Sequence, residues 1–351
     1  PDGLTRSIIG ELLTERDNKK KLRNTFPYGS DEYNLYDMQQ NVLKVIMNSY
    51  YGVSGFARFR LYDREIGSAV TSVGRAIIQH TRKIINENGY EVIYGDTDSC
   101  FVQLPMVSQE ETIEIARKLE AELNASYPTF AKETLGADDC YFSIKFEKIY
   151  RRFFQGGAKK RYAGHLTWKE GQEIDKIDIA GFEMKRSDSS HITREAQGAV
   201  LEMILKGNGK SDIKSYLPPI LKDYRAGKYP LDKAGIPGGI NKSLDDYAHL
   251  DAHGRGAQYA NQYLGTDFKR GSKPKRVYIK RSLRPDEFPN TDVICFEYPD
   301  QIPDDAFEID WETMLEKTIQ APLNRIFDAL GWDWDEFDPK VAKKTTLDMF
   351  F

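Results

Sequence analysis

The stretch EVIYGDTDSCFV, residues 91–102, decides the fold class and raises the main question about function. An apolar strand runs into Gly-Asp-Thr-Asp-Ser and a second apolar strand follows, which predicts a β-hairpin with Asp96 and Asp98 at its tip. Gly, Asp and Ser are residues that turns prefer, so a solvated turn would explain the tip as well as a functional site would. The rest of the chain has to distinguish these two interpretations.

Helical periodicity precedes the hairpin. We expect helices over residues 4–25 and 34–52, joined by a polar loop, which together form a helical hairpin. Gly52 is expected to end the second helix, whose apolar spacing predicts a stripe that is buried on one face. The members of this stripe are Leu35, Met38, Val42, Val45 and Ile46.

The pattern changes again around and after the hairpin. A third helix is expected over residues 63–88, and Ser108 with Glu111 has the spacing of a capping box at the start of a fourth. From Tyr141 onward apolar and polar residues alternate, which predicts strands, and helical signals return from Ser189. Helices and antiparallel strands in this order predict an α+β fold, with a small antiparallel sheet packed against helices.

Composition limits the class of protein. The chain has 351 residues, of which 40% are hydrophobic, and no stretch is apolar enough to cross a membrane. Its three cysteines have no metal-ligand spacing, so we expect a reducing, cytoplasmic setting. Pro1 in place of Met indicates a processed chain or a fragment.

Charge is unevenly distributed along the chain. A net charge of −4 alone would argue against a nucleic-acid partner. Half of the residues in the segment 269–284 are Lys or Arg and none is acidic, which predicts a local basic surface. The alternative interpretation of such a run is a solvated face.

The expected helical hairpin carries residues that suit a nucleoside triphosphate. Arg16 and Lys20 are four residues apart on the first helix, so both cations project from one face. The second helix places Lys44, Asn48 and Tyr51 on one face as well. Phosphates require cations, and a base or sugar stacks on an aromatic ring. The alternative interpretation is an ordinary polar helix face.

The two carboxylates of the hairpin tip suit magnesium. Mg²⁺ that arrives with phosphate oxygens is typically held by only one or two carboxylates, such as Asp96 and Asp98. Two such ions, roughly 3.5–4 Å apart, stabilise both the attacking and the leaving oxygen in phosphoryl transfer. The pair therefore supplies the other requirement of triphosphate chemistry.

The segment GGAKKRYAG, residues 156–164, places cations and an aromatic ring after two glycines. Such a segment suits contacts with a nucleic-acid backbone or groove edge. A basic strand edge that prevents aggregation is the alternative interpretation. The residues in question are Lys159, Lys160, Arg161 and Tyr162.

Three of these segments resemble the motifs of family B DNA polymerases, in the same order and with similar spacing. KVIMNSYYG (44–52) resembles the fingers motif, YGDTDS (94–99) the palm carboxylate motif, and KKRY (159–162) the primer-contacting motif. ELLTERDNKKK, residues 11–21, resembles the first fingers helix, and GFEMKRSD, residues 181–188, the segment that leads from palm to thumb. The resemblance spans nearly the whole chain and is greatest to archaeal members.

The resemblance implies three groups of site residues. The dNTP contacts would be Arg16, Lys20, Lys44, Asn48 and Tyr51. The catalytic residues and metal ligands would be Asp98, with Asp96 assisting, in a site that uses two Mg²⁺ ions. The contacts with primer and DNA would be Lys159, Lys160, Arg161, Tyr162 and Arg186, and the basic segment 269–284 would follow duplex phosphates.

The resemblance also implies a domain order. The regions would be a fingers helical hairpin (1–56), the C-terminal part of the palm (57–188), a mixed, mostly helical thumb (189–340) and a tail (341–351). The tail resembles a sliding-clamp-binding motif, although Lys344 stands where that motif prefers Gln. Its apolar anchors would be Leu347, Phe350 and Phe351. Docking of the two terminal Phe rings on the thumb is the alternative interpretation.

The function implied is template-directed DNA synthesis, by transfer of a nucleotide from a dNTP to a primer 3′-hydroxyl. The family's first palm carboxylate motif and its exonuclease precede the segment that this chain matches. We therefore expect an N-terminal polymerase half, in cis or in trans, to complete the metal ligands. The other expected partners are primed DNA and a sliding clamp, with no membrane, in an archaeal cell or nucleoid or in a virus. The alternative is a non-catalytic DNA-binding and clamp-tethering remnant, which predicts no metal-dependent dNTP binding.

Overall fold

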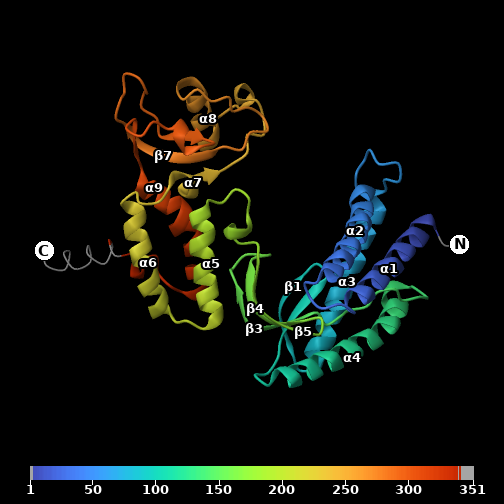
Figure 1. Ribbon diagram of the computed structural model, residues 1–351. Coiled ribbons are helices and arrows are strands. Elements are labelled where there is room, and N and C mark those ends of the chain that lie inside the picture. Colours follow the sequence, from blue (N-terminus) through green and yellow to red (C-terminus); the bar gives the residue numbers. More distant parts are fainter. Residues whose placement is uncertain (1–2, 339, 341–351) are drawn as a thin grey trace. The chain divides into compact units, whose positions relative to one another are not determined.

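The computed structural model describes residues 3–338 and residue 340. The chain forms two compact units, unit 1 (residues 1–146) and unit 2 (residues 147–351) (Figure 1). Both units combine helices with small antiparallel sheets, which confirms the predicted α+β class. The predicted domain boundaries stay predictions, and the predicted tail anchors Leu347, Phe350 and Phe351 lie outside the described residues.

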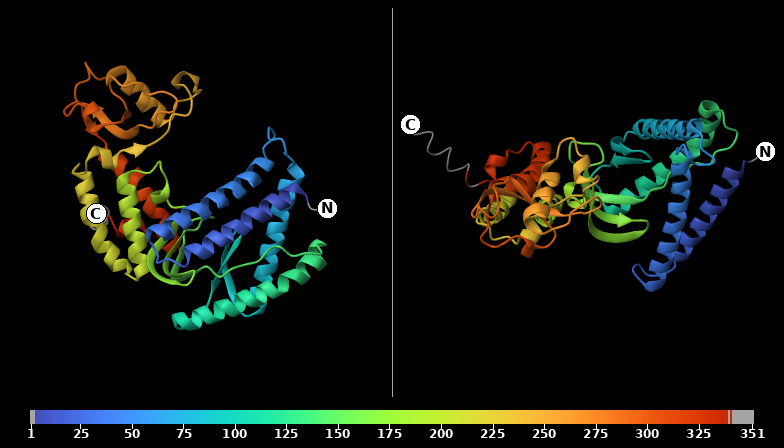
Figure 2. Two further views of the ribbon diagram at one scale, coloured as in Figure 1. Left: turned by 45° about the vertical axis from the view of Figure 1, so that its right-hand side comes forward. Right: turned by 90° about the horizontal axis from the view of Figure 1, so that it is seen from above.

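Unit 1 begins with the expected helical hairpin. Its helices are α1 (Leu4–Arg23) and α2 (Asp31–Ser54), which lie side by side in Figure 2. The hydroxyl of Ser30 accepts a hydrogen bond from the amide of Tyr33 and so caps α2. Near the loop, the buried Arg23 pairs with Asp37 at 2.8 Å and fastens the two helices together.

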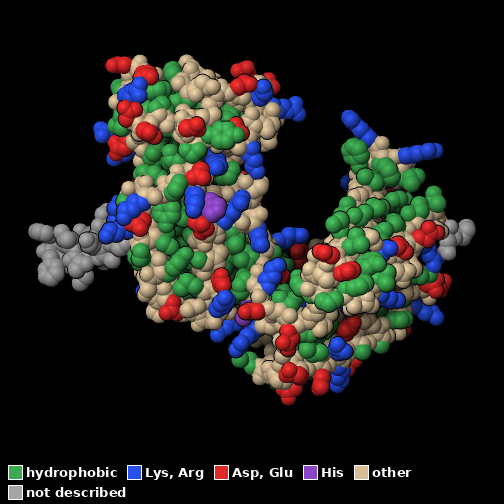
Figure 3. All heavy atoms as spheres, in the orientation of Figure 1, with side chains coloured by type: hydrophobic (Ala, Val, Ile, Leu, Met, Phe, Trp, Pro, Cys, Tyr) green, Lys and Arg blue, Asp and Glu red, His purple; other side chains and the backbone are tan. Residues whose placement is uncertain are grey.

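The predicted burial of the apolar stripe on α2 is wrong. Its five members are between 47% and 64% exposed. The helix α1 packs on another side of α2, the side that carries Gln40, which is only 4% exposed. Figure 3 shows hydrophobic side chains gathered over the part of unit 1 that α2 occupies. Gly52 does not end α2 either, because the helix continues to Ser54.

The rest of unit 1 packs around two further helices. The helix α3 (Arg64–Glu87) is capped by Asp63, and α4 (Gln109–Leu135) begins with the predicted capping box of Ser108 and Glu111. Between them, β1 (Glu91–Asp96) and β2 (Ser99–Gln103) form the predicted antiparallel hairpin. The core of this unit is formed by Ile85, Leu119, Leu123 and Tyr127.

The strand predicted from residue 141 is not present up to residue 147. Phe142, Ile144 and Phe146 alternate with exposed residues as expected, but the backbone pairs with no neighbouring strand. Instead, the side chain of Asn124 on α4 accepts from the amide of Ile144 and donates to its carbonyl, both at 2.9 Å. A side chain therefore provides the hydrogen bonds that a strand would have provided.

Unit 2 contains two sheets and a bundle of helices. The first sheet, β3 (Lys148–Gln155), β4 (Tyr162–Lys169) and β5 (Gln172–Ala180), is an antiparallel meander. The second contains β6 (Ile236–Pro237), β7 (Lys275–Ser282), β8 (Val293–Phe296) and β9 (Phe307–Ile309). The helices are α5 (His191–Lys206), α6 (Lys210–Arg225), α7 (Leu231–Ala234), α8 (Ala252–Tyr263), α9 (Trp311–Leu315) and α10 (Ala321–Leu330).

A large hydrophobic core joins these elements of unit 2. Side chains of α5, α6, α10 and the second sheet contribute to it, among them Leu201, Leu217, Val277 and Phe327. Where the chain is described, no helix combines the length and the apolar composition that crossing a membrane requires. All three cysteines are free thiols.

Candidate functional site

The tip of the β1–β2 hairpin is fixed by local hydrogen bonds. The amide of Asp98 donates to the carbonyl of Asp96, and the hydroxyl of Ser99 donates to the same carbonyl at 3.2 Å. Thr97 has a φ of 43°, an unfavourable conformation for a β-branched residue. Its hydroxyl donates to the carboxylate of Asp96 at 3.1 Å. Strain of this kind persists only where the surroundings enforce it and is common at functional sites.

The two carboxylates differ in their surroundings. Asp96 is half-buried and bonded to Thr97, whereas the carboxylate of Asp98 is exposed and accepts no hydrogen bond in the described part of the chain. Residues 3–338 and 340 contain no cluster of three or more His, Cys, Asp or Glu side chains that could hold a metal ion. Two hard carboxylates suit one Mg²⁺ that also binds substrate oxygens, but two ions need further ligands.

The structure places the five predicted dNTP contacts on the α1–α2 hairpin. Arg16 on α1 donates from Nε to Oε1 of the buried Gln40 on α2, at 3.2 Å. Gln40 in turn donates to Asp37 at 3.1 Å. Lys44 lies one helical turn beyond Gln40. Arg16 is thus held against the helix that carries three of the other predicted contacts, the exposed side chains of Lys44, Asn48 and Tyr51. The fifth, Lys20, is half-buried and lies one turn beyond Arg16 on α1.

The KKRY segment lies at the β3–β4 turn of unit 2. The amide of Gly156 donates to the carbonyl of Arg161 at 2.9 Å and closes the loop. Lys160 has a φ of 65°, and both Lys159 and Lys160 are exposed. Tyr162 stacks on Phe153 of β3, with ring centroids 5.6 Å apart. The loop therefore presents two cations and a fixed aromatic ring.

The segment that follows β5 supports this loop, a role that the sequence analysis missed. Gly181 packs so closely that a Cβ there would overlap the carbonyl oxygen of Lys160. The ring of Phe182 lies only 2.8 Å from where a Cβ on Gly156 would be. The only signal in the sequence is the Gly-Phe-Glu order before the predicted thumb, and this signal does not reveal the contact with Lys160.

Ion pairs occupy two of the predicted DNA-contacting cations, Arg161 and Arg186. Arg186 donates from Nε and Nη2 to the two carboxylate oxygens of Asp188, at 2.9 and 2.6 Å. This pairing raises the pKa of Arg186 and lowers the pKa of the Asp188 carboxyl group. Both side chains are about half exposed, so a phosphate can compete for Arg186 at moderate cost.

The basic segment 269–284 is partly neutralised within unit 2. Glu308 accepts from both Lys280 and Arg281, at 2.8 and 2.6 Å. Arg284 pairs with Glu287 and Asp305. Lys269 in the first half also pairs with Asp267, but that half contains five basic residues against three in the second half, so it retains the larger positive charge.

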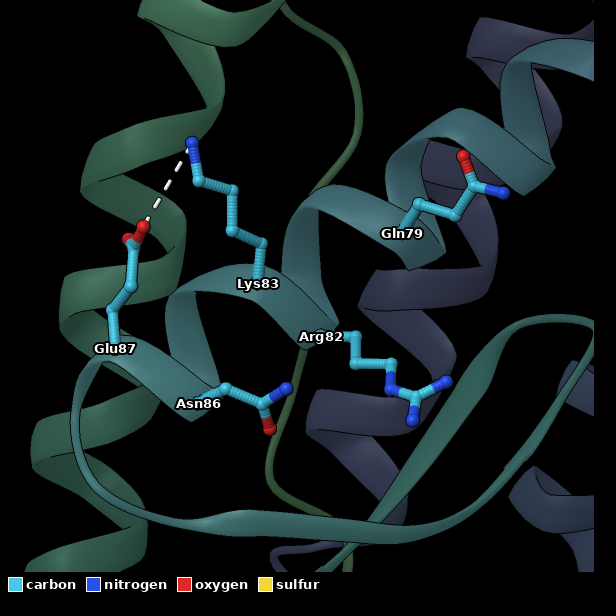
Figure 4. Close-up of a pocket in the computed structure, with 5 residues that line it drawn as sticks. All are labelled: Gln79, Arg82, Lys83, Asn86 and Glu87. Atoms are coloured by element: carbon cyan, nitrogen blue, oxygen red, sulfur yellow. Dashed lines mark ion pairs between the residues drawn. The ribbon is translucent and has the colours of Figure 1, made fainter.

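An open hollow of unit 1 lies on α3 and contains none of the predicted site residues. It has a volume of about 490 Å³ (Figure 4). An ion pair of 3.8 Å joins Lys83 and Glu87, which lie one helical turn apart (Figure 4). The side chains that line it are Gln79, Arg82, Lys83, Asn86 and Glu87. All of them come from one helix and none is buried, so the hollow has no features of a substrate pocket.

Comparison with known proteins agrees with this arrangement of motifs. Residues 2–330 match the model of DNA polymerase family B. The chain belongs to this family. It is 36% identical to DNA polymerase 2 of Aeropyrum pernix over 67% of this chain and 26% of that protein. It is 28% identical to a DNA polymerase of Archaeoglobus fulgidus over 100% of this chain and 42% of that protein.

Similarity extends to eukaryotic relatives and to a solved structure. The DNA polymerase delta catalytic subunit of Glycine max is 30% identical, with coverage of 93% of this chain and 29% of the relative. The family B DNA polymerase from Pyrobaculum calidifontis superposes with a TM-score of 0.58 and 28% identity over 93% of this chain and 38% of that one. The chain thus spans less than half the length of these family members.

Proposed function

We propose that this chain carries out template-directed DNA synthesis as the C-terminal part of a family B DNA polymerase. It would help to transfer a nucleotide from a dNTP to a primer 3′-hydroxyl. The observation that carries the proposal is the strained β1–β2 tip, with its exposed Asp98 carboxylate beside Asp96, in a chain of this family. A solvated turn needs neither the strain at Thr97 nor the hydrogen bonds that fix it.

Unit 1 supplies the dNTP contacts in this proposal. Arg16, oriented by Gln40, and Lys20 would bind phosphate oxygens from α1, and Lys44 would do so from α2. Farther along α2, Asn48 and Tyr51 would contact the base and sugar of the incoming nucleotide. These residues would act by positioning and by stabilising charge, which is how proteins catalyse phosphoryl transfer.

Asp98, with Asp96 assisting, would be the Mg²⁺ ligand of this chain. Two bound Mg²⁺ ions would stabilise the attacking and leaving oxygens of the displacement. The pair of carboxylates suits one ion, so a carboxylate outside this chain would complete the ligand set. We assign that residue to an N-terminal polymerase half, in cis or in trans.

Unit 2 supplies the DNA contacts. Lys159 and Lys160 would bind backbone phosphates, while Tyr162, fixed by its stacking on Phe153, would contact the sugar and groove edge of the primer terminus. Arg161 and Arg186 belong to the same set of proposed contacts. Binding of this kind is independent of sequence and sensitive to salt.

Two further partners belong to the proposal. The apolar stripe of α2 is exposed, as are Ile66 and Val70 of α3, and these side chains suit a contact with the N-terminal half. A sliding clamp would bind the terminal anchors Leu347, Phe350 and Phe351. The setting would be the cytoplasm or nucleoid of an archaeal cell, or a virus.

The rival function is that of a DNA-binding and clamp-tethering remnant without catalysis. It is favoured by the absence of a third carboxylate beside Asp96 and Asp98 in the part of the chain that the structure describes. Such a remnant has no use for a dNTP face, so the two functions differ in whether dNTP binding depends on metal.

Fluorescent dNTP binding by the full chain, with and without Mg²⁺, distinguishes the two functions. The polymerase proposal predicts Mg²⁺-dependent binding that is weakened roughly tenfold by Lys44→Ala, because one direct charge–phosphate contact contributes about 1.4 kcal/mol or more. Lys21→Ala, which removes an exposed cation of α1 outside the proposed face, is the matched control. A dNTP affinity that changes neither on removal of Mg²⁺ nor in Lys44→Ala would favour the remnant.

A further inference from the structure

Glu183 is a buried carboxylate that holds two arginines from distant parts of unit 2. It is only 8% exposed and lies three residues beyond the end of β5. Its Oε1 atom lies 3.1 Å from Nη2 of Arg161 in the KKRY segment and also contacts Nη1 of Arg325 on α10. Its Oε2 accepts a hydrogen bond of 2.9 Å from Gln197 of α5. The carboxylate therefore ties the KKRY loop to two helices.

Gln197, which binds this carboxylate, uses both its amide nitrogen and its carbonyl oxygen in further hydrogen bonds. It is completely buried, and its amide nitrogen also donates to the carbonyl of Pro322 at 3.1 Å. Its carbonyl oxygen accepts from the amide of Met184 at 2.9 Å. Glu183 thus has a fixed orientation, and the arginines that contact its other oxygen are placed with it.

The cluster contains more positive than negative charge. Two guanidinium groups share one carboxylate oxygen, so the three side chains carry a net charge of +1. Burial and the neighbouring Arg161 lower the pKa of Arg325, which agrees with two cations in close proximity. The Oε1 atom that the two arginines share accepts no aligned hydrogen bond, and the side chains of Arg161 and Arg325 are 23% and 44% exposed. Several N–H donors therefore remain available for an additional anion.

We propose that Arg161 and Arg325, oriented by Glu183, form a further binding site for a backbone phosphate of DNA. This inference rests on the proposed function, because it assumes that the adjacent Lys159, Lys160 and Tyr162 contact the primer strand. A phosphodiester is the anion that fits, since guanidinium pairs bind phosphate oxygens through several parallel N–H donors. Glu183 is the positioning residue of this site, and it does not contact the phosphate itself.

Two substitutions that change the charge of the cluster in opposite directions test the proposal: Arg325→Gln removes a positive charge and Glu183→Gln removes the negative charge. The full chain is titrated with a fluorescent primer–template duplex at several salt concentrations, and the slope of log affinity against log salt is measured. Each phosphate contact contributes about 0.9 to the steepness of this slope. Arg325→Gln is expected to flatten the slope by about this amount, whereas Glu183→Gln, which removes the competing negative charge, is expected to steepen it.

A purely structural ion-pair cluster predicts a different pattern. Both substitutions would then loosen the KKRY loop, and both would lower the affinity for the duplex without changing the slope of log affinity against log salt. Arg255→Gln is the matched control, because Arg255 is 46% exposed, similar to Arg325, but pairs with Asp292 and belongs to none of the proposed DNA contacts. Its removal is expected to leave the slope unchanged.

The outcomes separate this inference from the proposed function. A wild-type chain that shows no salt-sensitive duplex binding would overturn the DNA-binding part of the proposed function. Wild-type binding with an unchanged slope in Arg325→Gln, or a flatter slope in Glu183→Gln, would overturn only the phosphate site. Arg325→Lys keeps the charge and is expected to keep the slope, so it tests the site even where Gln at this position impairs folding.

Discussion

Arg16 on α1 and Gln40 on α2 are joined by a hydrogen bond of 3.2 Å from Nε to Oε1. This bond orients Arg16, a proposed contact of the triphosphate, through a buried side chain of α2. Gln40 also donates to Asp37, which pairs with the buried Arg23, so one polar network joins both helices. The hairpin is therefore held together by polar contacts, while its apolar stripe faces outward.

Replacement of Gln40 by Leu should both destabilise the hairpin and weaken dNTP binding. The substitution removes two hydrogen bonds from a buried position, which costs about 1–3 kcal/mol in free energy of unfolding, and it releases Arg16. Urea unfolding and fluorescent dNTP titration measure the two effects. Gln39→Leu is the matched control, since the buried Oε1 of Gln39 has no hydrogen-bond partner among the described residues and its loss should be neutral or stabilising. Equal destabilisation by the two substitutions would contradict the role of Gln40.

Gly181→Ala should disorder the KKRY loop. The new methyl group would overlap the carbonyl oxygen of Lys160, and the φ of 72° at this position adds strain. Gly171→Ala has a comparable φ of 95° but meets no atom within 4 Å, so it isolates the effect of the overlap. We expect Gly181→Ala to weaken duplex binding at least several-fold more than Gly171→Ala, as measured by fluorescence anisotropy. Similar affinities for the two variants would argue against support of the loop by this segment.

Asp178 should contribute to stability in a pH-dependent way. Burial would raise its pKa, but hydrogen bonds from Tyr150 and Lys148, at 2.6 and 2.9 Å, outweigh burial and hold the pKa below the ordinary value of 3.8. A depressed carboxyl pKa stabilises the folded state above pH 3.8, and this contribution is lost as the pH falls through the folded-state pKa. Asp178→Asn should therefore lower the free energy of unfolding at pH 7 by about 1–3 kcal/mol.

The measurement is urea unfolding of wild type and Asp178→Asn between pH 7 and pH 3. The difference between them should be constant down to about pH 4 and narrow below it. Asp286→Asn changes an exposed carboxylate and should have little effect at any pH. A difference that widens on acidification would contradict this account of Asp178.

Some elements were predictable from the sequence because their signals are local. The caps Asp63 and Ser108 and the turn at Thr97 depend on neighbouring residues alone. The stripe of α2 was misassigned because periodicity reports which residues share a face, not whether anything covers that face. The role of Glu183 depends on Arg161 and Arg325, which are far away in sequence, so no local pattern could predict it.

The exposed stripe leads to a prediction of its own. Leu35→Glu should leave the free energy of unfolding of the chain nearly unchanged, since Leu35 is 50% exposed, and it should weaken association with a separately supplied N-terminal polymerase half at least tenfold. Leu283→Glu in unit 2, with 48% exposure, is the matched control for association. Analytical ultracentrifugation measures binding and urea unfolding measures stability. A loss of stability on the scale of a core mutation would show that the stripe is buried after all.

The most direct test of the central claim is Mg²⁺-dependent extension of a primed template by this chain mixed with a separately supplied N-terminal polymerase half. We predict extension in the mixture that requires Mg²⁺ and falls at least a thousandfold in Asp98→Asn, while duplex binding is retained. Extension that persists in Asp98→Asn, or no extension in a mixture that still binds the duplex, would contradict the assignment of the β1–β2 tip as the catalytic carboxylate site.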